Sequence, residues 1–376
     1  MAPVINEHYP GLGKIPWIKI GDFPSRVEKL EEMGRAHGFP ELYIKRDDCC
    51  HPVYGGNKVR KLEYVLADAK AKNRRLLITV GATGSNQVLA TGIHGGEQGF
   101  RVMGVMFNQP NADYLRRNLL LDHHYGVEVK YTDGLAGEVL LLCYEYLKAA
   151  LRGDRPYYVP GGASSPVGNL GFANAVFELR NQIDEGVVPE PDYIVAAAGS
   201  LGTTAGLELG CRLLGLKSRV LAVRVGMPWM VNPKALADMV RSLCGYMRKY
   251  DPGVPEVGCT ESDVTMLSDY LGAGYAHLTE IGFNTVREMK ELEGIPVDPT
   301  YTGKALGGGL DWLSRRSEQD KVTLFWDTYN SMDLSGVSAQ VDYRDLPAAF
   351  HRYFEEPTQE EQFTKSRPQG EASATP

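Results

Sequence analysis

Residues 76–131 read LLITVGATGSNQVLATGIHGGEQGFRVMGVMFNQPNADYLRRNLLLDHHYGVEVKY, and the fold class follows from this part of the chain. Short apolar runs alternate in it with longer segments of mixed polarity. The apolar runs predict strands at 76–80, 101–107 and 127–131, and the segments between them predict helices near 85–98 and 112–125. Alternation of this kind is typical of βαβ units that build a parallel sheet. The sequence therefore predicts an α/β fold.

A second series of strands is predicted at 193–198, 219–225 and 321–326. Because 376 residues are too many for one simple core, the two series predict two lobes, each a mostly parallel sheet flanked by helices. The Pro-, Gly- and Ser-rich stretch at 155–166 is interpreted as a hinge, a crossover or an ordinary loop. After residue 354 the apolar content is very low, which predicts a disordered tail at 355–376.

Composition and charge favour a globular protein that acts on small molecules. The chain is 43% hydrophobic and 23% charged, which is ordinary for globular proteins. Its net charge of −7 predicts neither a nucleic-acid interface nor binding to an anionic membrane. The sequence shows no signal-peptide pattern and no apolar run of the roughly 20 residues that a membrane helix needs. We therefore expect a cytoplasmic protein.

Cysteine and histidine spacing does not indicate a metal site or a disulfide framework. The six cysteines are scattered, and the adjacent pair Cys49 and Cys50 is interpreted as ordinary packed or loop thiols. The histidines that were considered as ligands fall in no ligand motif: His94, His123, His124 and His277. We predict no metal.

The segment 45–69, KRDDCCHPVYGGNKVRKLEYVLADA, holds the first candidate for chemistry. A glycine pair places Lys58 at the start of an amphipathic helix, close to Arg60 and Lys61. The positive end of the helix dipole and these two neighbours are expected to lower the pKa of Lys58 and favour its neutral amine. Such an amine can form a Schiff base, although a basic helix start alone also fits a surface lysine.

Two loops that each follow a predicted strand supply possible ligand contacts. Ser85, Asn86 and Gln87 stand at a helix start, where free backbone N–H groups and polar side chains suit a carboxylate or phenolate, or form an ordinary capped turn. The run at 194–207, IVAAAGSLGTTAGL, is rich in Gly, Ser and Thr and suits a phosphate, or forms a structural turn. The chain lacks G-x-G-x-x-G, which disfavours an NAD-dependent oxidoreductase.

Five segments taken in order resemble one known family: IKRDD (44–48), GGNKVRKLEY (55–64), GSNQ (84–87), AAAGSLGTTAGL (196–207) and LEGIPVDPTYTGKA (292–305). It is the D-cysteine desulfhydrase and 1-aminocyclopropane-1-carboxylate deaminase family, which has the tryptophan-synthase-β-like fold, fold type II, of pyridoxal 5'-phosphate (PLP) enzymes. The resemblance implies a large PLP-binding domain from 1–52 plus 165–354, a small domain from 53–164, and a homodimer.

The resemblance also implies which residues bind the cofactor. Lys58 resembles the lysine that forms the Schiff base, Asn86 the asparagine that binds the phenolic oxygen, and Thr328 the hydroxyl that faces the pyridine nitrogen. The residues near the phosphate are implied to be Lys61 and the loop of Gly199, Ser200, Leu201, Gly202, Thr203 and Thr204.

Substrate contacts are implied for Ser85, Asn86, Gln87, Tyr275 and Tyr301. Ser85 is a candidate base, Gln87 a contact of the substrate carboxylate, and the two tyrosines, in Gly-flanked loops, candidate acids or bases. Lys58 or Ser85 would remove the α-proton. The implied activity is a lyase or deaminase reaction, α,β-elimination from a D-cysteine-like amino acid to a keto acid and ammonia. A PLP carrier without turnover is disfavoured by the two tyrosines.

Particular positions bear on the branch of the family. Deaminases that open the cyclopropane ring usually carry Glu after the second tyrosine and Leu near the pyridine nitrogen, so Thr302 and Thr328 favour the desulfhydrase side. Gln87 instead resembles the deaminases. Val88, Leu89 and Ala90 stand where an Arg is usual, and Tyr329 and Asn330 replace a Gly-Gly pair, which predicts added bulk near the ring. A divergent member that performs β- or γ-elimination or replacement is therefore an alternative.

Overall fold

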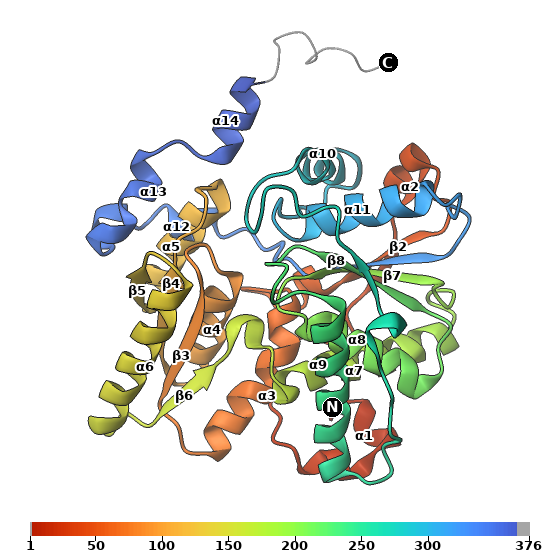
Figure 1. The fold of residues 1–376 in the computed structure, drawn as a ribbon, viewed down its shortest axis with the longest axis horizontal. Helices are drawn as coiled ribbons and strands as arrows, with labels where there is room; N and C mark the ends of the chain where they lie inside the picture. Colours follow the sequence, from red (N-terminus) through yellow and green to blue (C-terminus); the bar gives the residue numbers. More distant parts are fainter. Residues whose placement is uncertain (1, 367–376) are drawn as a thin grey trace.

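A computed structural model describes residues 2–366, which form two lobes with a separate sheet in each (Figure 1). The larger sheet has six strands, with β1 antiparallel to β2 and all other pairs parallel. In spatial order these are β1 (Val27–Lys29), β2 (Leu42–Arg46), β10 (Thr323–Asp327), β7 (Tyr193–Ala198), β8 (Arg219–Arg224) and β9 (Thr265–Leu267).

The smaller sheet has four parallel strands, β5 (Glu128–Thr132), β4 (Arg101–Phe107), β3 (Leu76–Ala82) and β6 (Pro156–Val159). Its flanking helices are α3 (Asn57–Ala71), α4 (Asn86–Glu97), α5 (Asp113–His124) and α6 (Leu135–Leu151). The long helices of the larger lobe are α2 (Glu31–His37), α7 (Pro166–Asp184), α8 (Gly202–Leu214), α9 (Pro233–Tyr250), α10 (Glu280–Glu288) and α11 (Thr302–Ser314), and α1 (Ile5–His8) is short. The predicted α/β class with mostly parallel sheets is confirmed.

Helix α3 lies between the lobes and carries Lys58 at its start. Its Leu62 packs in the core of the smaller lobe, and its Tyr64 packs in a core of the larger lobe. The N-cap, Gly56, has φ 91°, and a Cβ there would stand 2.6 Å from the carbonyl oxygen of Tyr329. Glycine is therefore needed for the helix to begin against the end of β10.

A buried ion network fixes α3 to the larger lobe. Arg60 donates from Nε to Asp47 Oδ2 at 2.7 Å and from Nη1 to Glu178 Oε2 at 2.8 Å. Lys45 donates to Glu178 Oε1 at 2.5 Å, and Trp326 Nε1 donates to Asp47 Oδ2 at 2.8 Å. Burial acts to raise the pKa of Glu178, but the charges of Arg60 and Lys45 outweigh it and lower that pKa to about 2. The arrangement of two basic and two acidic groups thus gives each buried charge of the network a partner of opposite charge or a hydrogen bond.

The C-terminal part of the chain differs from prediction. Leu334, Leu346, Phe350 and Tyr353 join the core of the smaller lobe, so the predicted placement of 334–353 in the large domain is wrong. Helices α12 (Ser335–Ser338) and α13 (Arg352–Glu355) lie beside α5, and α14 (Gln359–Ser366) follows (Figure 1). The predicted disorder is therefore wrong for 355–366, where Gln359 Nε2 donates to the carbonyl oxygens of Asn111 and Ala276. The rest of the predicted tail, 367–376, lies outside the described residues.

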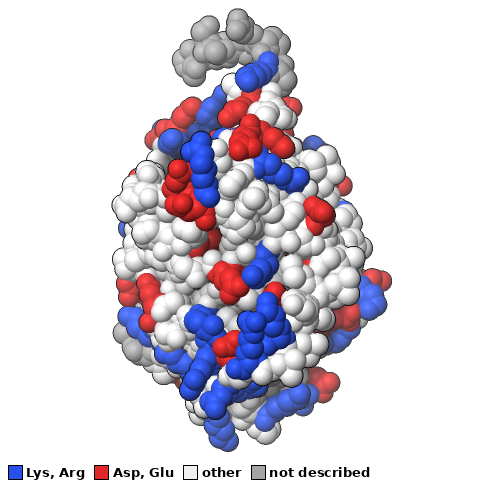
Figure 2. Space-filling model, turned by 90° about the vertical axis from the view of Figure 1, so that its left-hand side faces the viewer, with Lys and Arg blue, Asp and Glu red and all other residues white. Residues whose placement is uncertain are grey.

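Helix α6 turns both of its glutamates inward, while several of its apolar residues are exposed. Glu138 and Glu145 are 8% and 5% exposed, whereas Leu140, Leu147 and Leu151 are 72%, 62% and 90% exposed. Figure 2 shows the face that carries this helix, where uncharged surface covers much of the middle and Lys and Arg gather toward the lower end. An exposed apolar face of this kind is typical of a surface that another molecule covers. None of the helices described between residues 2 and 366 is long and apolar enough to span a membrane.

Candidate active site

A cavity of about 550 Å³ lies between the lobes, where β3, β7 and β10 end. Ligands of α/β proteins commonly bind at this edge of a parallel sheet. Most of the residues predicted for the site line the cavity: Lys58, Ser85, Asn86, Gln87, Gly199, Ser200, Leu201, Thr203, Tyr275, Tyr301 and Thr328. Lys61, Gly202 and Thr204 are buried directly behind this lining. The fold thus brings together segments that are far apart in the sequence.

Lys58 presents its amine inside the cavity and donates to Asn57 Oδ1 at 2.7 Å. Burial lowers the pKa of Lys58 to about 8, against the opposing charge of Asp298. The predicted direction is confirmed, but its cause is burial and not the predicted charges of Arg60 and Lys61. Arg60 is turned toward Asp47 and Glu178. A lowered pKa increases the neutral fraction of the amine near neutral pH, and the neutral amine is the nucleophile.

The loop between β7 and α8 forms one end of the cavity. Leu201 has φ 64°, a left-handed conformation that non-glycine residues rarely adopt, and it is the N-cap of α8. Thr203 Oγ1 accepts from Asn57 Nδ2 at 3.0 Å, and Thr204 Oγ1 donates to the carbonyl oxygen of Leu201 at 3.0 Å. The backbone N–H groups at the start of α8 therefore face the cavity end as an anion site.

Three further side chains complete this end. Lys61 Nζ donates to the carbonyl oxygen of Gly162 at 3.0 Å and to Ser164 Oγ at 3.2 Å. A Cβ at Gly202 would stand 2.7 Å from Lys61 Nζ and 2.4 Å from Ser164 Oγ, so glycine keeps the space beside the cation free. The buried amide of Asn169 has no hydrogen-bond partner among residues 2–366. Sequence reasoning missed Ser164 and Asn169, because Ser164 lies in the stretch interpreted as a hinge.

At the start of α4, Asn86 is held by two donors. Its Oδ1 accepts from Tyr54 OH at 3.2 Å and from Asn118 Nδ2 at 2.8 Å, which leaves Nδ2 to donate into the cavity. Ser85 caps α4, because its Oγ accepts a long hydrogen bond of 3.4 Å from Val88 N. Gln87 also lines the cavity, but its Nε2 donates to Thr91 Oγ1 at 2.6 Å, and its Oε1 has no partner in the described part of the chain.

The two predicted tyrosines meet in the cavity wall. The hydroxyl groups of Tyr275 and Tyr301 are hydrogen-bonded to each other. Burial raises the pKa of Tyr275 to about 12 and that of Tyr301 well above its usual range. Asp298, which sequence reasoning missed although it lies in the quoted DPTYTGK motif, accepts from Tyr301 N at 2.7 Å and from Thr302 Oγ1 at 2.7 Å. Asp298 therefore fixes the turn that presents Tyr301.

The residues that depart from the family pattern do not crowd the cavity. Tyr329 OH accepts from Arg117 Nη2 on α5 at 2.5 Å, and Asn330 Oδ1 accepts from Gly55 N at 2.7 Å. Neither side chain lines the cavity, so the predicted bulk near the ring is wrong. Val88, Leu89 and Ala90 lie in the core of the smaller lobe. Tyr329 and Asn330 thus form hydrogen bonds to neighbouring segments, and Val88, Leu89 and Ala90 fill a core.

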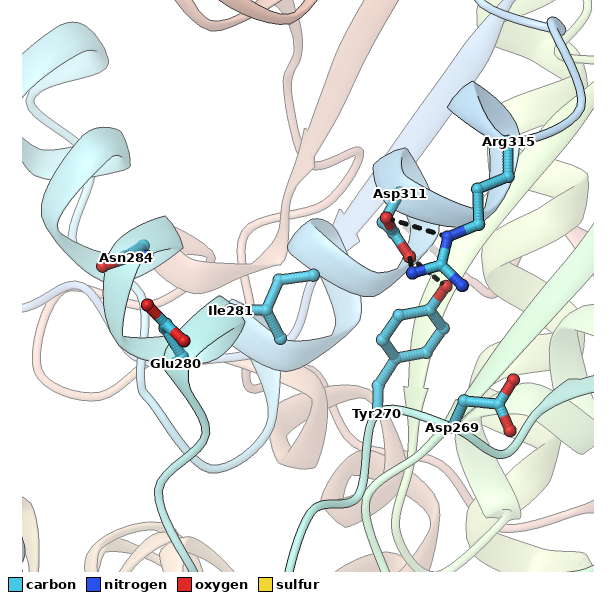
Figure 3. A pocket seen from close by; sticks show the side chains of 7 residues that line it. All are labelled: Asp269, Tyr270, Glu280, Ile281, Asn284, Asp311 and Arg315. Carbon is cyan, nitrogen blue, oxygen red and sulfur yellow. Dashed lines mark hydrogen bonds and ion pairs between the residues drawn. The ribbon is translucent and has the colours of Figure 1, made fainter.

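A second hollow, on the surface of the larger lobe, shares no lining residue with the cavity (Figure 3). In it, Asp311 accepts from Tyr270 OH at 2.7 Å and from Arg315 Nε at 3.1 Å. These groups satisfy one another and stabilise the surface of α11.

The thiol of Cys50 is buried, and that burial raises its pKa well above the usual range, which disfavours the reactive thiolate, as expected for a packed thiol.

The sequence profile of a family described as "Pyridoxal-phosphate dependent enzyme" matches residues 18–327. The chain belongs to this family. A protein of Pyrococcus horikoshii whose provisional name is 1-aminocyclopropane-1-carboxylate deaminase is 33% identical to this PLP-dependent enzyme over 336 residues, 89% of this chain and 96% of the other. A D-cysteine desulfhydrase of Klebsiella pneumoniae is 31% identical over 314 residues, 82% of this chain and 92% of the other. The crystal structure of a homologue of 1-aminocyclopropane-1-carboxylate (ACC) deaminase matches with a TM-score of 0.74 at 30% identity, over 90% of this chain and 99% of the other.

The cavity of this PLP-dependent enzyme fits its cofactor. The amide of Asn169, without a partner among the described residues, and the space beside Gly202 that a Cβ would fill suit a phosphate group near Lys61. Burial and then the charge of Lys58 lower the pKa of Lys61 well below its usual range, and a phosphate would favour its charged form. The amine of Lys58 and the free Nδ2 of Asn86 suit the aldehyde and the phenolic oxygen.

Proposed function

We propose that this enzyme catalyses α,β-elimination from a small β-substituted amino acid of the D-cysteine type, giving a keto acid and ammonia. The observation that carries the proposal is the neutral hydroxyl of Thr328 in the cavity lining, at the position that the resemblance implies for the group facing the pyridine nitrogen. A weakly protonated ring favours elimination over transamination. Thr302 adds support, because its hydroxyl is turned to Asp298 and adds no carboxylate to the lining.

Each chemical step is assigned to side chains of the cavity. When bound, PLP supplies an electron sink for negative charge at the substrate α-carbon. Lys58 binds the cofactor, and its amine or the hydroxyl of Ser85 removes the α-proton. The loop from Gly199 to Thr204, with Lys61, holds the phosphate, and Asn86 and Thr328 orient the ring.

The tyrosine pair is assigned to the leaving group. Because the pKa of Tyr275 is about 12 and that of Tyr301 is higher, both hydroxyls are protonated at neutral pH. Their mutual hydrogen bond leaves one proton available for donation into the cavity. The pair therefore acts as the acid that protonates the departing β-substituent.

A second candidate is ring opening of 1-aminocyclopropane-1-carboxylate. Gln87 lines the cavity, as the resemblance to the deaminases implies, and the relative of Pyrococcus horikoshii carries that name. Assays of D-cysteine, L-cysteine and 1-aminocyclopropane-1-carboxylate for keto acid and sulfide separate the two candidates. Sulfide from D-cysteine supports elimination, and keto acid from the cyclopropane substrate alone would replace it by ring opening.

Borohydride reduction of the holoenzyme followed by peptide mapping tests the role of Lys58. The expected result is a pyridoxyl label on the peptide that contains Lys58, and loss of label and turnover in Lys58→Ala. Lys72→Ala serves as the matched control, since Lys72 follows the same helix and its side chain is 53% exposed. A label on another lysine would end the proposal.

We also propose that the protein is a homodimer, as the family resemblance implies. The outward apolar face of α6, formed by Val139, Leu140, Tyr144, Leu147 and Leu151, supports this assembly. A face that is self-complementary across a two-fold axis can be covered by its own copy.

A further inference from the structure

Glu138 is an acidic residue of the cavity wall that the proposed reaction does not use. It stands in the first turn of α6, lines the cavity and is 8% exposed. Its Oε1 has no hydrogen-bond partner among residues 2–366. Buried polar atoms of proteins are nearly always hydrogen-bonded, so an acceptor left open in a cavity wall points to a ligand that binds there.

The position of Glu138 is fixed near Ser85. The backbone N–H of Gly81 donates to the Glu138 carboxyl, and a Cβ on Gly81 would stand 2.4 Å from Ser85 Oγ. Glu138, Tyr158 and Tyr275 line the same cavity, and the Glu138 charge adds to burial, the main cause, in raising the pKa of both tyrosines. Glu138 therefore faces the part of the cavity where a substrate side chain would lie.

The charged groups of the lining leave Glu138 without a counter-ion. Within the described chain, the charged residues that line the cavity are Lys58, Glu138 and Asp298. Asp298 is saturated by the turn at Tyr301, and Lys58 is assigned to the cofactor. The side chains beside Glu138 along α6 and across the cavity mouth are apolar: Leu135, Val139, Trp229 and Met230. Above about pH 7, where Glu138 is mostly ionised, an anionic substrate side chain would meet one carboxylate and no cation there.

We propose that Glu138 selects the substrate by accepting a hydrogen bond from a donor on the β-substituent, so that the enzyme takes amino acids whose side chain carries an amide, hydroxyl, thiol or ammonium group and rejects anionic ones. This inference rests on the proposed function, because it assumes that the α-amino acid binds at Ser85 and Lys58. It adds a specificity residue that comes from α6, outside the motifs that carry the resemblance.

The test uses the PLP-loaded enzyme and three ligands of nearly equal shape: asparagine, aspartate and leucine, each as the D- and the L-enantiomer. Dissociation constants are measured from the change in cofactor absorbance and, independently, from the ligand-induced shift in melting temperature. The wild type is expected to bind asparagine roughly tenfold or more tightly than leucine or aspartate, the range for a hydrogen bond to a charged group.

Two substitutions of Glu138 make the result specific. Glu138→Gln replaces one oxygen by a donor and is expected to tighten aspartate binding by roughly tenfold, whereas Glu138→Leu is expected to remove the preference for asparagine over leucine. Glu145→Gln is the matched control, because Glu145 is equally buried on the same helix, pairs with Lys148 and does not line the cavity.

The outcomes separate this inference from the proposed function. Unchanged ligand ratios in both Glu138 variants overturn the inference, while turnover by the wild type leaves elimination standing. A wild type that prefers aspartate also overturns it. A holoenzyme that responds to none of the ligands and releases no keto acid from any amino acid contradicts both.

Discussion

Asn86 presents one side of its amide to the cavity because Tyr54 and Asn118 both donate to its oxygen. We expect Tyr54→Phe to weaken PLP binding by up to about tenfold, since one neutral hydrogen bond is worth roughly 0.5–1.5 kcal/mol. Fluorescence titration with PLP gives the affinity, and a pH series of absorbance spectra reports the electronic state of the bound ring. Tyr64→Phe is the control, because Tyr64 is buried and its hydroxyl has no partner among the described residues. Equal effects of the two substitutions would argue against an orienting role.

Glu138 should also leave a signature in stability. Burial raises its pKa to about 7 from an ordinary 4.5, although the backbone N–H of Gly81 acts against this. The folded protein therefore binds a proton that the unfolded chain has released between these values, and stability falls as pH rises from about 4.5 to 7. Of the other titratable groups of the cavity, Tyr158 and Tyr275 have raised pKa values and Lys58 has a pKa of about 8, all above this window. Burial raises the pKa of Asp298, but Asp298 is common to the proteins compared, so substituting Glu138 isolates the effect of Glu138.

We expect Glu138→Gln to stabilise the protein above pH 7 by roughly 1–3 kcal/mol and to match the wild type below about pH 5. Thermal unfolding at pH 5, 6, 7 and 8, with and without PLP, measures the difference. A constant offset between the two proteins across this range would show that Glu138 does not titrate there.

Single residues of the site differ in how far the sequence could predict them. Lys58, Asn86 and the Gly199–Thr204 loop were predicted because glycines and helix starts mark such positions, and the structure gathers them in one cavity. Asn169 and Glu138 were missed because each stands inside a helix, where a polar residue gives no local sign that it faces a cavity. Their roles depend on packing between helices far apart in the sequence.

Among the elements, α3 depends on its buried ion network for its place between the lobes. We expect Glu178→Ala to destabilise the protein by roughly 3–5 kcal/mol, because it leaves the buried Lys45 without the carboxylate it pairs with and Arg60 with only one of its two. Urea unfolding followed by tryptophan fluorescence measures this. The control is on α7, the helix that carries Glu178. There Asp184→Ala removes an exposed ion pair with Arg180 and should lower the free energy of unfolding by less than about 1 kcal/mol. Similar losses for both would contradict the importance of the network.

The strands show where periodicity is informative. The six predicted strands correspond to β3, β4, β5, β7, β8 and β10. All but β5 are mostly buried apolar runs, whereas in β5 only Val129 is buried. Strand β6 was missed inside the Pro- and Gly-rich stretch, since it is an edge strand that begins at Pro156, where a missing N–H costs little. The short edge strands β1 and β9 have three residues each and give too brief a pattern.

For the whole molecule, we expect the double substitution Leu147→Asp and Leu151→Asp to turn the proposed homodimer into a monomer. Two desolvated carboxylates at the centre of an apolar interface oppose association. Sedimentation velocity measures the change, and PLP absorbance checks that the cavity is intact. Val187→Asp is the control, because Val187 is 49% exposed but lies away from α6, after α7. A wild type that sediments as a monomer would contradict the assembly itself.

The return of residues 334–353 to the core of the smaller lobe has a consequence for synthesis on the ribosome. The lobe that begins near α3 lacks Leu334, Leu346, Phe350 and Tyr353 until β10 of the larger sheet has been synthesised. Its sheet therefore waits, with part of its apolar surface uncovered, while more than half of the protein is translated. Domains commonly fold as units during synthesis, but the core of this lobe closes only after the strands of the larger sheet have been made.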